Sequence, residues 1–448
     1  MAEEIKHDRV QIRWKNFRGF RDTGWLEIKP LTILIGANNA GKTSLVAPLL
    51  LMDQTLSSPD QHMPLVTRGN LYDAGTFADL IRNHDKSNEL FFGIRFHLHE
   101  HHDKVRPVDD YPPGCLELTF GAGKTAEEVL LKRYAVFDVF NRPYLYRSLQ
   151  AAGNYSLAGI PTAHLKSLEH KVIRESRPTR FFFTPTTLLA GLQPKEGKGS
   201  SRSVSFSSSF VLYITVISEV FAQIRSLFDR LSYIGPLRER PRKYYQLTGE
   251  TPKTVGSRGE RAPNLVRRRF ATLKKELNRW VGEFELGDQI EYKDMAEDLF
   301  SILFKKAKGR THNISGSGFG ASQVFPLIVQ AVASKPRDII IAEQPEIHLN
   351  PRLQIVLADL FVECASKNRT VIVETHSEHL LLRVRRLVAS GKIPAQNVAI
   401  YFVERKAAES VVTLVPIQKN GHIEPQSWPT GFFGETLSES LALAEAQS

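Results

Sequence analysis

The order of apolar and polar residues predicts strands in the first part of the chain. Residues 10–14 alternate apolar and polar, residues 25–28 do so more weakly, and residues 31–35 are almost all apolar. Alternation and short apolar runs are both typical of strands. Between residues 91 and 183, β-branched and aromatic runs separated by Gly, Pro and Asp predict further strands.

The last third of the chain predicts strands and helices in alternation. Strands are expected at residues 338–342, 370–374 and 398–403. Helices are expected before and between them, at residues 318–332, 351–366 and 379–390. Because such alternation is typical of a mostly parallel sheet covered by helices, we expect an α/β fold.

Two more helices are expected in the middle of the chain. Residues 264–280 place their large apolar side chains on one side, as an amphipathic helix does. Residues 209–231 contain the most apolar window, residues 210–221. A membrane span needs about 20 apolar residues, and Glu219 interrupts this window. We therefore expect a buried helix and no membrane partner.

Composition narrows the class of protein. Hydrophobic residues make up 42% of the chain, which excludes disorder of the whole chain. The length of 448 residues suggests two to three domains, or one large domain with insertions. Two cysteines cannot form a disulfide framework, and the first residues lack a signal-peptide pattern, so we expect a cytoplasmic protein. The 59 Lys and Arg exceed the 48 Asp and Glu, and the net charge of +11 favours an anionic partner.

Residues 36–43 match the phosphate-binding pattern G-x-x-x-x-G-K-[ST]. The pattern follows a predicted strand and precedes a helix, so backbone N–H groups and the positive helix end can hold phosphates. We expect Lys42 to reach the β- and γ-phosphates of ATP and Thr43 to bind Mg²⁺. The other residues expected to contact ATP are Gly36, Asn38, Asn39, Ala40, Gly41 and Ser44. A second Gly-Lys-Thr, residues 123–125, lacks the first glycine and predicts a turn.

Two predicted strands end in residues suited to ATP chemistry. The first is followed by Glu343, Gln344 and Glu346, and the second by His376. Ligands of parallel sheets bind at the carboxyl ends of the strands. Glu343 can therefore hold the water shell of Mg²⁺, and His376 can hydrogen-bond the γ-phosphate and report its presence.

A Gly- and Ser-rich stretch, residues 315–323, opens a predicted helix and offers a second phosphate cradle. One chain does not need two cradles for one nucleotide. Two chains do, if Gly318, Gly320 and Ser322 of one chain close over the γ-phosphate held by the other.

These elements, in this order, resemble the ABC-type ATPase heads of the RecF, SMC and overcoming-lysogenisation-defect (OLD) group. Residues 16–20 and 31–43 look like their N-terminus, residues 318–323 like their signature, and residues 343–351 like their Walker B and D-loop. The resemblance implies an α/β P-loop NTPase head with a mixed sheet and an N-terminal β-meander. The implied parts are two head segments, residues 1–90 and 311–448, and a β-rich and helical insertion between Walker A and signature, residues 91–310.

Two further stretches, residues 233–245 and 428–433, look like a bacterial AAA/ABC-type family with a C-terminal domain of unknown function. Such ATPases are often subunits of anti-phage defence systems. OLD-type nucleases carry a nuclease domain after the switch histidine, but only 72 residues follow His376. We therefore expect no nuclease domain in this chain.

One residue departs from the usual pattern of these heads. Gln344 follows Glu343, at the position where a glutamate usually acts as general base. A glutamine can orient water but cannot take its proton, so hydrolysis is expected to be slow. Glu346 is the nearest alternative carboxylate.

Two hypotheses follow from the sequence. In the first, ATP closes a homodimer or higher homo-oligomer that acts as a sensor or switch in antiviral defence, controlling a separately encoded effector such as a nuclease or toxin. In the second, the protein is a RecF- or SMC-like repair or clamp-type ATPase that binds DNA, which would make nucleic acid a partner. The phosphates of DNA would contact three basic clusters, at residues 238–243, 258–279 and 305–310.

Overall fold

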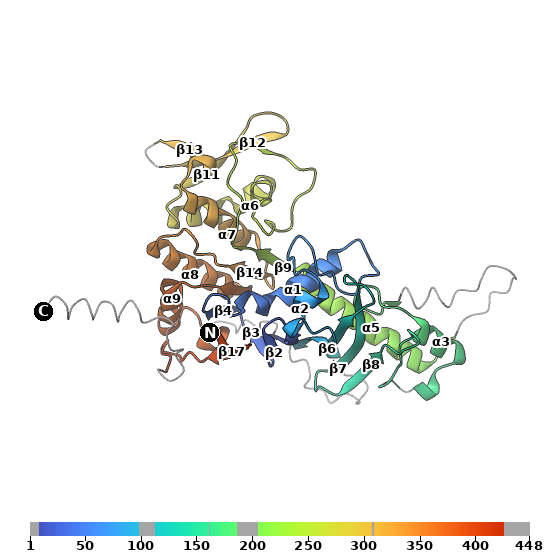
Figure 1. The fold of residues 1–448 in the computed structure, drawn as a ribbon. Helices are drawn as coiled ribbons and strands as arrows, with labels where there is room; N and C mark the ends of the chain where they lie inside the picture. The colour runs from blue at the N-terminus through green and yellow to red at the C-terminus, as the bar shows by residue number, and fades with distance from the viewer. Residues whose placement is uncertain (1–8, 98–112, 161, 186–204, 307–308, 425–448) are drawn as a thin grey trace.

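The computed structural model describes residues 9–97, 113–160, 162–185, 205–306 and 309–424, and these residues form three sheets (Figure 1). A mostly parallel sheet lies in the middle. A small sheet with helix α6 lies at one end, and strands β6 to β8 with helices α3 and α5 lie at the other (Figure 1).

The first sheet is antiparallel and has the order β2-β1-β5-β6-β7-β8, with β3 also pairing with β1. Its strands are β1 (Arg9–Phe17), β2 (Phe20–Asp22), β3 (Leu26–Ile28), β5 (Leu90–His97), β6 (Pro113–Ala122), β7 (Val129–Asp138) and β8 (Pro143–Ser148). The predicted N-terminal strands are confirmed. Because β1 pairs with β5, the N-terminal strands and the strands of the expected insertion share one sheet.

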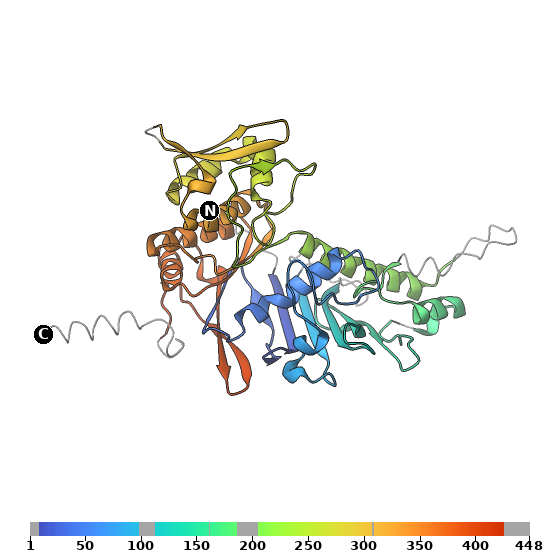
Figure 2. The ribbon, with the colours of Figure 1, turned by 45° about the horizontal axis from the view of Figure 1, so that its top comes forward.

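The second sheet carries the site and has the order β17-β16-β4-β15-β14-β9. Its strands are β4 (Leu31–Gly36), β9 (Leu231–Ile234), β14 (Ile339–Glu343), β15 (Thr370–Glu374), β16 (Val398–Lys406) and β17 (Glu409–Val415). All neighbours are parallel except β16 and β17, which form the red hairpin at the lower edge of Figure 2. The expected α/β class, with a mixed sheet and N-terminal antiparallel strands, is confirmed.

The described helices lie around the first two sheets, and a third, small sheet packs against α6. The helices are α1 (Lys42–Ser57), α2 (Phe77–Leu80), α3 (Ser167–Glu175), α5 (Ser208–Asp229), α6 (Ala262–Glu283), α7 (Phe319–Ala333), α8 (Pro351–Ser366) and α9 (Glu378–Ala389). The small sheet contains β10 (Tyr245–Gln246), β11 (Gln289–Asp294), β12 (Leu299–Lys305) and β13 (Thr311–Asn313).

Two hydrophobic cores lie on the two faces of the parallel sheet. Along β4, Leu34 belongs to the core shared with β1, α1 and α5, whereas Leu31, Ile33 and Ile35 belong to the core shared with α6 to α9. Side chains alternate between the faces of a strand, and both faces of this strand are buried. This is why β4 is apolar at nearly every position.

Helix α5 is, among the described residues, the one helix long and apolar enough to cross a membrane. One face of it is packed inside the protein, where Tyr213, Ile217 and Val220 are fully buried in the first core. In its most apolar stretch of 18 residues, 39% of the residues are buried. The expected buried helix is thus confirmed for one face.

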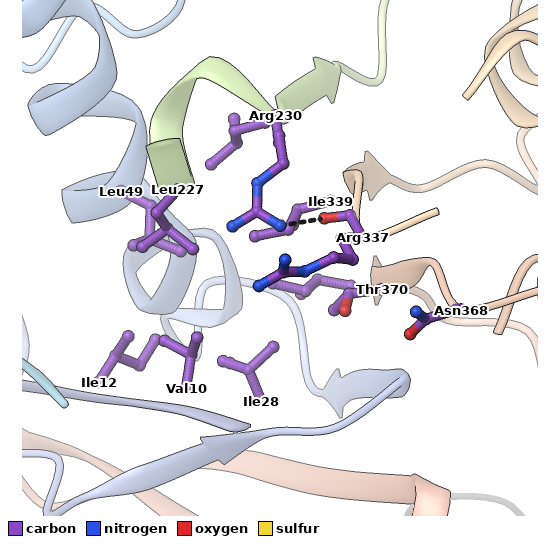
Figure 3. A pocket seen from close by; sticks show the side chains of 12 residues that line it. Val10, Ile12, Ile28, Leu49, Leu227, Arg230, Arg337, Ile339, Asn368 and Thr370 are labelled. Atoms are coloured by element: carbon purple, nitrogen blue, oxygen red, sulfur yellow. Dashed lines mark hydrogen bonds between the residues drawn. The ribbon is translucent and has the colours of Figure 1, made fainter. Parts of the chain in front are cut away.

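A small pocket lies where the antiparallel sheet meets the parallel sheet (Figure 3). Val10, Ile12 and Leu49 form apolar walls, and the guanidinium of Arg230 donates to the carbonyl oxygen of Arg337 at 3.3 Å beside them (Figure 3). The pocket is at the amino ends of β14 and β15, which begin at Ile339 and Thr370. It is therefore at the opposite edge of the sheet from the predicted ATP site.

Candidate nucleotide-binding site

The predicted phosphate loop connects β4 to α1 at the carboxyl edge of the parallel sheet. Gly36 and Gly41 have φ angles of 147° and 110°, a region that favours glycine. A Cβ on Gly36 would lie 2.0 Å from the carbonyl oxygen of Val403, so β16 also excludes any side chain there. Helix α1 has no side-chain cap and no acid in its first turn. Its first N–H groups are therefore available to an anion.

Lys42 points back into this loop. Its Nζ donates to the carbonyl oxygens of Gly36 and Ala37 at 3.0 and 2.9 Å, and only 4% of the residue is exposed. Burial lowers the pKa of Lys42, against the opposing effect of Glu374 and Glu346. The ammonium thus lies within the curve of the loop, where the predicted phosphates would bind.

Thr43, the predicted Mg²⁺ ligand, contacts a carboxylate that the sequence analysis did not select. Its Oγ1 donates to Oε2 of Glu374 at 2.8 Å. Burial raises the pKa of Glu374, while the hydrogen bond from Thr43 and the charge of Lys42 act in the opposite direction. Glu374 is an acid at the end of an apolar strand, the same signal that selected Glu343.

Glu343 ends β14 and is 5% exposed. Burial, with a smaller effect from Glu374, raises the pKa of its carboxyl to about 8. The Tyr233 hydroxyl hydrogen-bonds this carboxyl, and its Oε1 has no partner among the described residues. The carboxyl is therefore buried with an unused oxygen, as a group that binds a cation would be.

Gln344 and Glu346 lie in the turn that follows β14. Gln344 has a φ of 42°, and its backbone N–H donates to the carbonyl oxygen of Glu374 at 2.8 Å. Oε1 of Glu346 accepts from the backbone N–H of His376 at 2.7 Å. Burial raises the pKa of Glu346 and lowers that of His376, which Lys42 lowers further. The structure therefore joins the ends of β14 and β15 through these residues.

Arg238 also reaches this group, although in the sequence it is only one of four basic residues between positions 238 and 243. It follows β9, is 6% exposed, and donates from Nη2 to the carbonyl oxygen of Glu343 at 2.9 Å. Burial lowers its pKa to about 10, with Glu346 and Glu343 among the opposing charges. A basic cluster gives no sign of which member turns inward, so only the β9–β14 pairing reveals this contact.

The proposed second cradle lies at the start of α7. Gly318 precedes the helix, and a Cβ there would meet no atom within 4 Å. A Cβ on Gly320 would lie 2.9 Å from the carbonyl oxygen of His348, so this turn packs against the segment after β14. Ser322 is 4% exposed, and its hydroxyl accepts from Nε2 of Gln323 at 3.2 Å. The open part of the predicted cradle is therefore Gly318, whereas Ser322 faces the interior.

Buried polar atoms without a partner gather at this edge of the sheet. The described residues contain twelve such side-chain atoms, and five of them belong to Arg238, Glu343, Glu346 and His376. An unsatisfied buried polar group costs about 1–3 kcal/mol. Four neighbouring residues with such atoms fit a site completed by a polar ligand, and the chemistry of the donors fits Mg²⁺ and a polyphosphate.

The sequence matches models of known protein families, and one of these matches shows the family of the chain. A model described as "AAA domain, putative AbiEii toxin, Type IV TA system" matches residues 143–383, more than half of the chain. The chain belongs to this AAA domain family. A second model, for an AAA ATPase domain, matches residues 10–171 and includes the phosphate loop of this AAA protein. A third, for a protein of unknown function (DUF3696), matches residues 393–443, and the expected C-terminal domain is thereby confirmed. Residues 428–433, which suggested it, lie outside the described residues.

Solved structures similar to this AAA protein include heads of SMC proteins. An SMC head bound to the C-terminal winged-helix domain of ScpA is 11% identical, covers 92% of this chain and 99% of its own, and has a TM-score of 0.42. The SMC head domain of Thermotoga maritima is 11% identical, with coverages of 92% and 100% and a TM-score of 0.39. Such low scores support no inference about function. No curated protein matches the sequence.

Proposed function

We propose that this AAA protein binds Mg²⁺ and ATP at the carboxyl edge of the parallel sheet and hydrolyses ATP slowly. The observation that carries the proposal is the gathering of unpartnered buried atoms of Arg238, Glu343, Glu346 and His376 next to the phosphate loop. The match of the AAA ATPase domain to residues 10–171 supports the choice of ATP.

The chain's own residues divide the tasks of binding. The phosphates would be held by the Lys42 ammonium and by backbone N–H groups of the loop. These N–H groups belong to Gly36, residues 38–41 and Ser44. Thr43 and Glu343 would hold Mg²⁺, which, when bound, neutralises charge on the β- and γ-phosphates. His376, with an unpartnered Nε2, would hydrogen-bond the γ-phosphate.

Slow hydrolysis is proposed from the residues at the end of β14. Gln344 can position a water molecule but cannot accept its proton. Glu346 can accept a proton, but one of its oxygens is held by the backbone of His376 at 2.7 Å. Phosphoryl transfer depends chiefly on positioning and charge stabilisation, so an amide at this place permits turnover without making it fast.

A homodimer or higher homo-oligomer closed by ATP is proposed from the second cradle. Gly318 lies at an open helix start, and α7 has neither an acid in its first turn nor a side-chain cap. Such a helix end favours an anion. The γ-phosphate of a second copy would be that anion, with the backbone of Gly318 and Gly320 approaching it. Ser322 would contribute only after its buried hydroxyl left Gln323.

The biological role is proposed to be a switch in antiviral defence that controls a separately encoded effector. The description of the matched family names a toxin–antitoxin system, a two-component arrangement that supports a separately encoded partner. The division into residues 1–90, 91–310 and 311–448, a cytoplasmic location and the lack of a nuclease domain remain predictions within this proposal.

The arginines of α6 give little support to the alternative hypothesis that the protein binds DNA. Arg267 makes two hydrogen bonds of 3.2 Å to Asp294 and lies against the ring of Tyr292. Arg268 and Arg269 donate to the carbonyl oxygens of Thr248 and Ala333. These side chains therefore have internal partners. A steep loss of duplex binding with salt would nevertheless favour this alternative.

The test of ATP binding compares two Gly-Lys-Thr lysines. Lys42→Ala removes charged hydrogen bonds and should weaken ATP binding about 10- to 100-fold. Lys124→Ala is the matched control, because Lys124 is exposed in the turn between β6 and β7. Equilibrium dialysis with labelled ATP and Mg²⁺ measures both. Equal affinities of the two variants would refute the assignment of the loop.

A further inference from the structure

A third carboxylate lies between the phosphate loop and Glu343. In the parallel sheet, Glu374 is opposite Leu34 of β4 on one side and opposite Glu343 of β14 on the other. Glu374 is thus on the strand next to the phosphate loop, whereas Glu343 is one strand farther away. Adjacent strands are about 4.8 Å apart, so Glu374 is the closer of the two acids to Thr43.

The hydrogen bond between Thr43 and Glu374 fixes what the Thr43 hydroxyl can do. A hydroxyl has one hydrogen to donate and two lone pairs that accept. Because its hydrogen points to Oε2 of Glu374 at 2.8 Å, both lone pairs are directed elsewhere. In this orientation the oxygen can act only as an acceptor or as a ligand of a cation.

The carboxylates at this edge of the sheet do not form a metal site of three or more protein ligands. Within the described residues, no three Asp, Glu, His or Cys side chains are grouped closely enough for that. Mg²⁺ usually binds through one or two carboxylates together with substrate phosphates and water. A site made of Thr43, one or two strand-end acids and the phosphates of ATP is consistent with both facts.

We propose that Glu374 belongs to the Mg²⁺ site, where it orients the Thr43 hydroxyl toward the ion and adds a second negative charge beside Glu343. This inference rests on the proposed function, since it assumes that ATP binds at the loop. It adds an acid of β15 to the two residues, Thr43 and Glu343, that the sequence pattern assigned to metal binding. Glu374 acts on the ion through Thr43 and is in this respect a positioning residue.

The variant Glu374→Gln tests the negative charge of Glu374, because it removes the charge and leaves the shape of the side chain almost unchanged. Gln keeps an oxygen that can accept the hydrogen bond from Thr43 and has nearly the same volume, so the fold should be retained. Mutation of a residue that supports a metal ligand typically weakens metal binding about 10- to 100-fold. We expect Mg²⁺ to strengthen ATP binding in the wild type, and this gain to fall about tenfold or more in the variant. With EDTA, the variant should bind ATP as well as the wild type or better, because a negative charge near the phosphates is gone.

The experiment measures the affinity for ATP by calorimetry, with Mg²⁺ and with EDTA, in three proteins. Asp338→Asn is the control, since Asp338 immediately precedes β14 at the opposite edge of the sheet and should not alter the Mg²⁺-dependent gain. An unchanged gain in Glu374→Gln would overturn the role of Glu374 and leave the proposed function intact. A wild type that does not bind ATP under either condition would overturn both.

Discussion

The raised pKa of Glu343 predicts that the protein releases protons when it binds Mg²⁺ and ATP. At a pKa of about 8, about nine-tenths of the Glu343 carboxyls carry a proton at pH 7. A carboxyl must lose its proton to interact strongly with Mg²⁺. Binding of preformed Mg²⁺·ATP should therefore release about 0.9 proton per site at pH 7 and about 0.1 at pH 9. In Glu343→Gln the part of the release that comes from this carboxyl should vanish.

The same carboxyl should make stability depend on pH. Its pKa is about 8 in the folded protein, against an ordinary value of 4.5. Between these values the folded chain retains a proton that the unfolded chain loses, so this contribution to stability falls as pH rises and is lost above about 8. In this range, each rise of one pH unit lowers the contribution of this carboxyl to the free energy of unfolding by about 1.4 kcal/mol. From pH 5.5 to 8.5, the wild type should lose about 3 kcal/mol relative to Glu343→Gln.

Two assays check these numbers. Calorimetry in two buffers of different ionisation enthalpy gives the protons released on binding, and urea unfolding with EDTA gives stability at each pH. Gln resembles the protonated carboxyl, so the two proteins should be about equally stable at low pH and diverge toward high pH. Parallel stability curves, together with equal proton release by both proteins, would refute the assignment of a raised pKa to Glu343.

Two further substitutions test catalysis and self-association. Gln344→Glu places a potential base after Glu343 and should speed single-turnover hydrolysis at equal ATP occupancy, by about 10²–10⁴-fold in the most favourable case; an unchanged rate would mean that Gln344 is not next to the attacking water. Gly318→Arg should abolish ATP-dependent dimerisation in sizing experiments without loss of fold, because a side chain there has open space. Persistence of the dimer in Gly318→Arg would exclude this cradle from the interface.

Much of the site could be predicted from local sequence. The glycines, Lys42 and Thr43 have a fixed spacing because the loop must curve around phosphate oxygens. The acids at the ends of apolar strands were recognisable because those strands are parallel and their carboxyl ends meet at one edge. The expected strands and helices of the last third also follow from side-chain periodicity, which reflects which face of each element is buried.

The tertiary structure decided which of these residues meet. The order β4-β15-β14-β9 places Glu374, rather than Glu343, against Thr43, and brings Arg238 to the carbonyl oxygen of Glu343. The lateral order of strands leaves no periodic signal in any single strand, because it results from how the helices pack between them. Ser322 is buried for a related reason: the spacing of a glycine-rich motif does not fix which side of the following helix faces the core.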